Sequence, residues 1–463
     1  MQTVERIHDI YRPAAERVRD FAEVERSLSE ADLTAQATRC MACGIPFCLG
    51  AGCPLGNVVP ETSAYVRAGK WREAWEILAA TSPLTEFTSR VCPALCENAC
   101  VNNLATDSPV MIRQLEKIII ETAFARGYVR PVVPAVRSGK QIAVIGSGPA
   151  GLLAAELLNR AGHTVSVFEK NASPGGLLRY GIPDFKLEKA LIDRRVRVME
   201  AGGVKFRCGT EIGKDIAADY LAKTFDAVVI AIGTPAARDL NVPGRELRGI
   251  HLALEYLQGE NRAVSGESAA APINAKGKRV LVIGGGDTGS DCVGTALRQQ
   301  ASSVTQIDII PAPPATRSAA TPWPDWPYQL TTSSSQKEGG ERLWNRLTKK
   351  FTGKSGTVSG AEIAEVKWEF VNGRPAKFAE VTGSGQPFKT DLVFIAMGFT
   401  GVPADSAIAK ELALTVTPRG QLVGDPARHI FTVGDARTGQ SLVVRAMADA
   451  GQIVAAVNAR LAR

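Results

Sequence analysis

The sequence of 463 residues predicts an α/β protein in which a helical N-terminal region precedes two Rossmann-like units with doubly wound parallel sheets. Two observations carry this prediction. A pattern of strand, glycine turn, helix and strand occurs at residues 141–170 and again at 278–310, and this is an internal repeat of one supersecondary unit. Before it, residues 1–135 show apolar residues at helical spacing and hold most of the nine cysteines.

Composition and charge exclude several classes of protein. The formal net charge is +7 and no dense run of lysine and arginine is present, so we expect no nucleic-acid partner. No run of eighteen or more apolar residues occurs, so no membrane span is expected. The N-terminus, "MQTVERIHDIYRPAAERVRDF", is charged throughout and lacks the apolar core of a signal peptide. We therefore expect a cytoplasmic protein.

Local patterns predict the elements around these units. The stretch "SAYVRAGKWREAWEILAATS" has amphipathic spacing with Gly69 as a helix stop, and "PVMIRQLEKIIIETAFARGY" predicts a further helix. Residues 131–140 are rich in proline and predict a linker. Residues 321–342 predict an irregular surface loop, because proline and serine are frequent there. Residues 392–399 and 429–438 predict short buried strands that end in glycine turns.

The first glycine turn has the features of a dinucleotide site. A GxGxxG pattern that begins at Gly146 follows an apolar strand and opens a helix. Glycines here allow a tight turn and close approach of a pyrophosphate, and the helix N-terminus supplies oriented N–H groups. Glu169 ends the next strand, where a carboxylate binds a ribose hydroxyl. The loop residues assigned to the cofactor are Gly146, Gly148, Pro149, Ala150 and Gly151.

A second GxGxxG pattern begins at Gly284, after the strand "VLVI". Two dinucleotide folds in one chain predict a flavin dinucleotide and a nicotinamide dinucleotide. A late Gly434–Asp435 pair is typical of the residues that meet the flavin in reductases with two such domains. We therefore assign FAD to the first loop and this late segment, with the NADH or NADPH domain inserted between them. The residues assigned to the nicotinamide coenzyme are Gly284, Gly286, Asp287, Thr288, Gly289 and Asp308.

The choice between NADH and NADPH depends on the end of the second strand of each repeat. Alignment of "HTVSVFE" with "SSVTQID" places Asp308 where Glu169 stands. A carboxylate there favours a free 2′-hydroxyl and repels a 2′-phosphate. Ile309 and Ile310 follow, where an NADPH enzyme would often carry arginine, although Arg317 lies near enough in sequence to meet a phosphate. The sequence favours NADH.

The cysteines of the N-terminal region fall into two groups, "CMACGIPFCLGAGCP" from Cys40 to Pro54 and "CPALCENAC" from Cys92 to Cys100. Dense clustering in a reducing compartment favours a metal or redox cofactor over disulfides, and an odd total fits a disulfide framework poorly. The spacing resembles a ferredoxin more than a zinc site, because zinc ribbons pair one CxxC with another or with histidines. Seven cysteines leave one ligand missing from the eight that two [4Fe–4S] clusters ordinarily need.

Taken together, these motifs resemble the small (β) subunit family of glutamate synthase. The matching segments span most of residues 39–451 and are "CMACGIPFC", "GCPLGN", "RVCPALCENACV", "GSGPAG", "PGGLLRYGIPDFKL", "GGGDTGSDCVGT", "PWPDWP" and "TVGDARTGQSLVVRAMADA". The chain is also similar to the N-terminal, electron-input part of dihydropyrimidine dehydrogenase. The resemblance implies a helical iron–sulfur domain with two [4Fe–4S] clusters, one FAD, and NADH or NADPH as substrate.

The resemblance also implies which residues hold each cofactor. One cluster takes three cysteines of the first group and the last of the second: Cys40, Cys43, Cys48 and Cys100. The other takes the remaining three: Cys53, Cys92 and Cys96. Its fourth ligand is a non-cysteine residue, Glu116, in the helix "IRQLEKIII". Gly176 and Leu177, in "PGGLLRYGIP", are expected at the FAD. No catalytic acid, base or nucleophile is expected, because the cofactors carry the chemistry.

The function that the resemblance implies is that of an electron-input subunit. NAD(P)H reduces FAD, and electrons leave through the clusters to the large (α) subunit, which converts glutamine and 2-oxoglutarate into two glutamates. One alternative is the small reductase subunit of a pyrimidine-reducing or ferredoxin-linked transhydrogenase complex. Another is a non-enzymatic scaffold that holds structural zinc. The expected domains are residues 1–135 for the clusters, 136–270 and 396–463 for FAD, and 271–395 for NAD(P)H.

Overall fold

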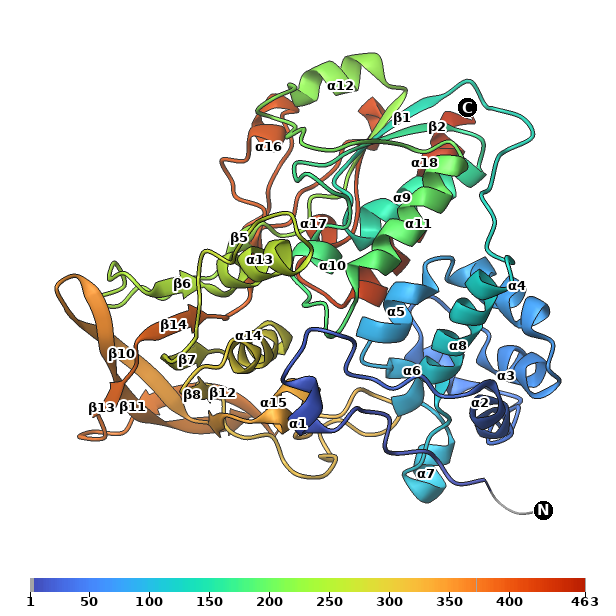
Figure 1. Cartoon of the computed structure of the whole chain (residues 1–463). Helices are drawn as coiled ribbons and strands as arrows, with labels where there is room; N and C mark the ends of the chain where they lie inside the picture. The colour runs from blue at the N-terminus through green and yellow to red at the C-terminus, as the bar shows by residue number, and fades with distance from the viewer. Residues whose placement is uncertain (1–3, 372, 463) are drawn as a thin grey trace.

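The structure, a computed structural model, describes residues 4–371 and 373–462 and has three parts (Figure 1). The N-terminal helices, drawn in blue, form one part. The other two are built on parallel sheets, the first mostly teal and green and the second mostly yellow and orange. Within the described residues, no helix is both long and apolar enough to cross a membrane.

The N-terminal domain is built from short helices around one longer helix, α8. Ile119 and Ile120 of α8 are fully buried, and α3 and α4 pack against it. Gly69, with φ +68°, separates α3 from α4, and this confirms the predicted helix stop. The elements of this domain are α1 (Ala14–Arg17), α2 (Glu30–Ala37), the π-helical turn η1 (Cys48–Gly52), α3 (Val59–Arg67), α4 (Trp71–Thr81), α5 (Thr85–Val91), α6 (Leu95–Asn98), α7 (Asn102–Thr106) and α8 (Ile112–Ala125).

The first parallel sheet has the strand order β16–β4–β1–β2–β3. Its edge strand β16 comes from the C-terminal part of the chain and pairs with β4, as the split arrangement of this unit predicts. The elements of this first unit are β1 (Gln141–Ile145), α9 (Pro149–Arg160), β2 (Thr164–Phe168), α10 (Leu177–Tyr180), α11 (Lys189–Ala201), β3 (Lys205–Arg207), α12 (Ala218–Thr224), β4 (Ala227–Ile230), α16 (Ala407–Glu411), η2 (Pro426–Arg428), β16 (Ile430–Thr432), α17 (Asp435–Thr438) and α18 (Val443–Leu461).

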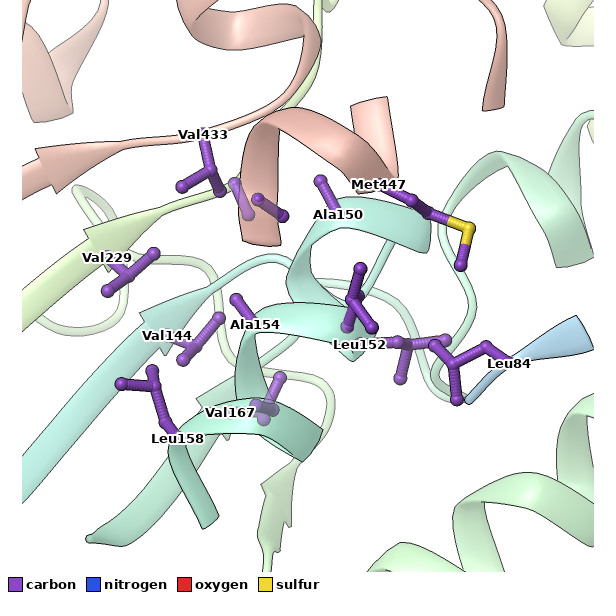
Figure 2. Close-up of a cluster of buried hydrophobic side chains, with 14 of the residues drawn as sticks. Leu84, Val144, Ala150, Leu152, Ala154, Leu158, Val167, Val229, Val433 and Met447 are labelled. Atoms are coloured by element: carbon purple, nitrogen blue, oxygen red, sulfur yellow. The ribbon is translucent and has the colours of Figure 1, made fainter. Parts of the chain in front are cut away.

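One apolar core joins the first unit to the helical domain (Figure 2). Val144 of β1 and Val167 of β2 pack against Leu158 of α9, and α18 contributes Met447 from above. Leu84, which precedes α5 in the helical domain, enters the same core and is fully buried. Burial of apolar surface therefore holds the helical domain against the first unit.

The second parallel sheet has the order β6–β14–β7–β8–β9. Its β7, α14 and β8 repeat β1, α9 and β2, as the internal repeat predicts. The predicted domain limits stay predictions, but the pairing of β6 with β14 places residues 250–252 in this sheet, ahead of the boundary at 271. The elements are β6 (Ile250–Leu252), α13 (Ala253–Val264), β7 (Arg279–Ile283), α14 (Asp287–Arg298), β8 (Ser303–Ile307), α15 (Ser334–Glu338), β9 (Glu341–Leu343) and β14 (Leu392–Ile395).

Two features of the second unit were not expected from the sequence. Residues 321–342 contain a helix and a strand, α15 and β9, where the sequence predicts an irregular loop throughout. An antiparallel sheet then projects from this unit, with β11 paired to β10, β12 and β13. Its strands are β10 (Arg346–Lys354), β11 (Thr357–Val371), β12 (Arg374–Glu380) and β13 (Gln386–Lys389). Where the chain crosses between the units, β5 (Ala236–Ala237) and β15 (Phe399–Gly401) pair with each other.

Candidate nucleotide and iron–sulfur sites

The first glycine loop joins β1 to α9 and leaves the N-terminus of α9 open. Gly146 has φ +100°, and a Cβ there would overlap with the carbonyl of Ala231 after β4. A Cβ on Gly151 would overlap with the Gly146 carbonyl. Apart from chain neighbours, no described atom lies within 4 Å of a Cβ built on Gly148, and no described side chain caps α9. This open cradle of N–H groups fits a pyrophosphate.

Glu169 follows β2 and is buried beneath this loop, where its carboxylate has partners within the protein. Oε2 accepts hydrogen bonds from the N–H and the hydroxyl of Ser147, at 3.1 and 2.5 Å. Oε1 accepts from the backbone N–H and the side-chain amide of Asn171, at 2.9 and 2.7 Å. The Ser147 hydroxyl in turn accepts from the N–H of Gly175 at 3.0 Å. Glu169 therefore fixes the shape of the loop as well as standing where the sequence places a ribose contact.

Two further segments close around the first loop. A Cβ on Gly176, which has φ +51°, would lie 2.7 Å from the Cα of Gly148. A Cβ on Gly434, which has φ +63°, would lie 2.7 Å from the Cβ of Ala150. The Gly434 N–H donates to the carboxylate of Asp449 at 2.8 Å. Both segments thus approach the glycine loop at places where only glycine fits.

The remaining residues assigned to FAD lie at the starts of helices near this loop. Pro149 begins α9, Leu177 begins α10 with its side chain exposed, and Asp435 begins α17. The Ser441 hydroxyl donates to Asp435 Oδ1 at 2.6 Å, and burial raises the pKa of that carboxyl. The structure therefore gathers the predicted flavin residues around one end of the first sheet.

The second glycine loop repeats the geometry of the first. Gly284 has φ +125°, and a Cβ there would overlap with the carbonyl of Ala396 after β14. A Cβ on Gly289 would overlap with the Gly284 carbonyl. The N-terminus of α14, at Asp287 and Thr288, has no side-chain cap among the described residues, and the space beside Gly286 is open. The residues fit the phosphates of a second dinucleotide.

The acidic residue of the second unit stands in a different environment. Asp308 is half-buried after β8, and its Oδ1 accepts a hydrogen bond from the N–H of Ile310 at 3.1 Å. Burial raises the pKa of this carboxyl. Arg317, which the sequence allows as a phosphate contact, donates from Nη2 to Asn98 Oδ1 in the helical domain at 2.6 Å.

Four cysteines from both sequence groups line one cavity of the helical domain. Burial raises the pKa of the Cys48 thiol to about 12, and neighbouring charges on Cys100 and Cys40 add to this. Met41 and Ile45 beside them are 57% and 77% exposed, so this site lies near the surface. We call these four residues the outer set: Cys40, Cys43, Cys48 and Cys100.

The other three cysteines lie within the electrostatic field of the Glu116 carboxylate. Glu116 is 7% exposed, and burial raises its pKa to about 7. Its Oε1 accepts a hydrogen bond from Asn57 Nδ2 at 2.7 Å. Burial and then the nearby charge of Glu116 raise the pKa of all three thiols, and the pKa of the Cys53 thiol reaches about 11. We call these residues the inner set: Cys53, Cys92, Cys96 and Glu116.

Both sets fit a group larger than a single ion. Over residues 4–371 and 373–462, no three histidine, cysteine, aspartate or glutamate side chains converge as the ligands of one metal ion do. A [4Fe–4S] cluster takes one ligand per iron, so its four ligands surround the cluster and do not meet at a point. All nine cysteines are free thiols, and each set offers four ligand side chains.

The inner set lies on the side of the helical domain that faces the first unit. Leu55 and Val91, each within two residues of an inner-set cysteine, pack against the core of the first unit. A buried ion pair between Arg195 Nε of α11 and Glu86 Oε1 of α5, at 2.6 Å, joins the same two parts. The inner set therefore lies near the core of the first unit.

Sequence analysis missed several residues that shape these sites. Asn57 binds Glu116 and also accepts a hydrogen bond from the Thr81 hydroxyl at 2.8 Å. Lys186 of the first unit, which is partly buried, forms an ion pair with the buried Asp291 of α14 across the contact between the two units. Asn57 lies in the motif "GCPLGN", so the motif itself was the only sequence signal.

Comparison with known proteins identifies the family. Residues 17–128 match the family model described as dihydropyrimidine dehydrogenase domain II, 4Fe-4S cluster, and residues 140–450 match pyridine nucleotide-disulphide oxidoreductase. The chain is 47% identical to the glutamate synthase [NADPH] small chain of Mycobacterium tuberculosis, over 96% of this chain and 92% of that one. The chain belongs to the glutamate synthase small-chain family. The resemblance inferred from the sequence is confirmed.

Two further similarities bear on the small-chain fold and coenzyme. The glutamate synthase [NADH] of Saccharomyces cerevisiae is 39% identical over 98% of this chain and 22% of its own length. The structure of Mycobacterium tuberculosis FprA in complex with NADPH aligns with a TM-score of 0.55 at 19% identity, over 70% of this chain and 85% of that one, and this shows the fold alone. This small-chain family member is an NAD(P)H-dependent flavin and iron–sulfur oxidoreductase.

Proposed function

We propose that this chain is the electron-input subunit of a cytoplasmic glutamate synthase and serves a large subunit through one FAD and two [4Fe–4S] clusters. The observation that carries the proposal is the presence of two interleaved four-ligand sets in the helical domain, one of them against the first unit. When bound, flavin accepts the hydride of NAD(P)H and the clusters carry single electrons. The residues of the chain bind, orient and enclose these groups.

Each unit contributes a distinct part of this task. In the first unit, the glycine loop presents backbone N–H groups to FAD and Gly434 lets its own segment approach that loop, while Glu169 holds Ser147 and therefore the loop in place. In the second unit, the open N-terminus of α14 receives the coenzyme phosphates. The partly buried ion pair between Lys186 and Asp291 joins the two units.

The packing supports one order of the two ligand sets. The inner set is close to the core of the first unit, and the outer set lies beside the exposed Met41 and Ile45. We infer that the inner set lies between the flavin and the outer set, and that the outer set lies towards the large subunit. Electrons that follow this route reduce the partner. Because this chain only transfers electrons, it needs no acid–base pair of its own.

Replacement of Glu116 tests the inner set. Glu116→Ala is expected to lower the iron content from about eight to about four per chain. Flavin content should not change, because Glu116 is remote from the glycine loops. The measurement is an iron and flavin assay on protein purified without oxygen, with electron paramagnetic resonance to count reduced clusters.

Glu121 provides the matched control on the same helix. It forms ion pairs with Arg90 and Arg194 at 3.0 and 2.8 Å and has no place in either set. Glu121→Ala should keep both clusters. Full iron content in Glu116→Ala, or equal iron loss in both variants, would contradict the ligand assignment.

The partner is tested by reconstitution. Alone, the chain is expected to reduce artificial electron acceptors with NADH or NADPH and to form no glutamate. Addition of a glutamate synthase large subunit should give a stable complex that forms glutamate from glutamine and 2-oxoglutarate. If no complex and no glutamate form with either coenzyme, the partner assignment fails and a pyrimidine-reducing or transhydrogenase complex takes its place.

A further inference from the structure

The end of β8 presents a carboxylate beside the second glycine loop. Asp308 Oδ2 lies so close to Gly285 that a Cβ on Gly285 would overlap with it. In this class of sheet, the adenosine ribose of a dinucleotide lies at the residue that ends the second strand. A carboxylate there accepts hydrogen bonds from ribose hydroxyls and repels a 2′-phosphate.

Arg317 is the first arginine after Asp308 in the sequence, but its guanidinium is already bound elsewhere. Nη2 donates to Asn98 Oδ1 at 2.6 Å, and Nη1 donates to the carbonyls of Thr321 and Asp325 at 3.0 and 2.8 Å. Asn98 Nδ2 donates to the carbonyls of Pro324 and Asp325, at 3.1 and 3.0 Å. We call this network of Asn98, Arg317 and the three carbonyls the Asn98 clasp.

The Asn98 clasp ties the second unit to α6, the helix that carries Cys96. Asn98 is the last residue of α6, between Cys96 of the inner set and Cys100 of the outer set. A second contact lies beside it, where the rings of Phe47 and Trp323 pack with their centroids 4.6 Å apart. The segment 321–325 is therefore fixed against the helical domain at two points.

The same segment brings an unsatisfied hydroxyl to the carboxylate. The Tyr328 hydroxyl is buried and has no hydrogen-bond partner among the described residues. Burial and then the charge of Asp308 raise the pKa of Tyr328, so this hydroxyl lies within the electrostatic field of that carboxylate. The Tyr328 N–H donates to the hydroxyl of Thr321 at 2.9 Å, which connects it to the clasp segment. Buried hydroxyl groups normally have a partner, and a ligand hydroxyl would supply one here.

A second arginine approaches Asp308 from β9. Arg342 Nη1 donates to the carbonyl of Thr331 at 3.0 Å, and its guanidinium lies 5.0 Å from the centre of the Trp344 ring. Its charge opposes that of Asp308. Arg342 is therefore the other arginine that could bind a 2′-phosphate, and the test includes Arg342→Ala.

We propose that the cluster domain sets the coenzyme preference: Asn98 holds Arg317 away from the adenosine ribose, so that Asp308 and Tyr328 select the free 2′-hydroxyl of NADH over NADPH. Arg317 and Asn98 are positioning residues, whereas Asp308 and Tyr328 contact the ribose. The inference rests on the proposed assignment of the nicotinamide coenzyme to the second unit. It makes one contact between domains responsible both for assembly and for substrate choice.

The test measures binding to the full chain with its flavin and iron present. The probes are ADP and 2′-phosphoadenosine 5′-diphosphate, titrated by calorimetry, because they differ only by the 2′-phosphate. The chain should bind ADP more tightly by at least about tenfold. Arg317→Ala should change neither affinity, because Arg317 is already withheld. Asn98→Ala should tighten binding of the 2′-phosphate probe by about five- to tenfold, and Asn98→Ala with Arg317→Ala should cancel that gain.

Several results would overturn the proposal. One is that the unaltered chain binds the 2′-phosphate probe as tightly as ADP or more tightly. If Arg342→Ala then lost binding of that probe, the phosphate would be assigned to Arg342. Weaker binding of that probe in Arg317→Ala would show that Arg317 already reaches it. Absence of any gain in Asn98→Ala, with iron content unchanged, would remove the role of Asn98. If Asn98→Ala loses iron, its comparison with Asn98→Ala plus Arg317→Ala still decides, because both variants lack the same amide. Equal binding of the 2′-phosphate probe by these two variants would remove the role of Arg317.

Failure of the proposed function is distinguished by one further variant. Gly289→Ala disturbs the second glycine loop and should weaken ADP binding by up to about 100-fold. If ADP affinity is unchanged in Gly289→Ala, the second unit is not the coenzyme site. If Gly289→Ala weakens ADP binding but the unaltered chain fails to discriminate between the probes, the site is right and the Asn98 proposal is wrong.

Discussion

In the first unit the acid after β2 is buried and accepts hydrogen bonds from the side chains of Ser147 and Asn171, whereas in the second unit the acid after β8 is half-buried and its partners are backbone N–H groups such as that of Ile310. The middle residue of each glycine loop, which lies next to the acid, also differs between the units. Ser147 binds Glu169, but the corresponding residue, Gly285, has no side chain. The first acid holds its own loop, and the second remains open to a ligand. This fits a tightly kept FAD and a coenzyme that must exchange.

Other parts of the two units are closely alike. In each, the first glycine of the loop approaches the carbonyl of the residue that follows β4 in the first unit or β14 in the second. The third glycine of each loop approaches the carbonyl of the first glycine. In each, an aspartate just before that strand accepts from the N–H of the residue that begins the first strand: Asp226 from Gln141 at 2.8 Å, and Asp391 from Arg279 at 3.0 Å. The backbone is shared, so differences in function must come from the few side chains that differ.

The largest expected effect is the loss of nucleotide affinity when the third glycine of either loop is replaced. Gly151→Ala and Gly289→Ala place a methyl group on the carbonyl of the first glycine in each loop. Overpacking of this kind costs about 1–3 kcal/mol, so nucleotide affinity should fall by up to about 100-fold. Gly151→Ala should be purified with little flavin, whereas Gly289→Ala should keep its flavin and show a raised KM for NADH. Flavin absorbance and steady-state kinetics measure the two effects.

The opposite pattern would reverse the assignment of the loops. If Gly289→Ala lost flavin and Gly151→Ala kept it, FAD would belong to the second unit. Gly209→Ala is a matched control, because Gly209 also lies in the first unit and a Cβ there meets nothing within 4 Å, although its φ is +65°. It should keep flavin and KM unchanged.

Sequence reasoning located both glycine loops because their requirements are local. A GxGxxG turn, an apolar strand and an acid at a fixed distance lie within about thirty residues, and each has its own physical reason. The grouping of the cysteines, in contrast, came from resemblance, because no spacing rule states that Cys100 joins Cys40. The structure brings these two together in the outer set.

Features that depend on distant contacts were not predictable. Arg317 and Asn98 are separated by 219 positions, so nothing near Arg317 in the sequence shows that it is already bound. The antiparallel sheet of residues 346–389 was missed for a different reason. Its strands β10 and β11 contain register shifts, at Thr348–Lys350 and Glu369–Phe370, that interrupt the alternation by which a strand is recognised.

The next effect tests whether the two acids differ as their surroundings indicate. Glu169→Gln turns one acceptor atom into a donor, so hydrogen bonds to Ser147 or Asn171 are lost inside the protein. The expected cost is about 1–3 kcal/mol in the free energy of unfolding. Asp308 accepts only from backbone N–H groups in the described residues, and the Asn oxygen can still accept from them, so Asp308→Asn should change the free energy of unfolding by less than about 0.5 kcal/mol. Chemical unfolding of both variants measures the difference.

A binding measurement completes this pair. Asp308→Asn should narrow the preference for ADP over its 2′-phosphate form, because the repulsive charge is gone. Glu169→Gln should leave that preference unchanged. If Asp308→Asn proved as destabilising as Glu169→Gln, the second acid would be structural too, and the contrast between the units would disappear.

The smallest effect concerns the aspartates that the two units share. Arg279 holds the pKa of Asp391 at about 2, through hydrogen bonds at 2.8 and 2.6 Å, and the N–H of Gln141 lowers the pKa of Asp226. A lowered pKa in the folded state means that the stabilisation is complete above about pH 4 and is lost as the pH falls towards the folded value. Asp391→Asn should therefore lower Tm near pH 7 by about 1–3 °C.

The pH series provides the decisive comparison for these aspartates. The Tm difference between the unaltered chain and Asp391→Asn should shrink as the pH falls from about 4 towards 2, because protonation removes the same charge that the substitution removes. Asp226→Asn should show a smaller difference at pH 7, since Lys140 contacts only one oxygen, at 3.1 Å, whereas Arg279 contacts both. Both ion pairs are partly exposed, so added salt should weaken both effects. If the Tm difference stayed constant down to pH 3, the stabilisation would come from the backbone hydrogen bond alone. The two units would then share a hydrogen bond whose contribution does not depend on charge.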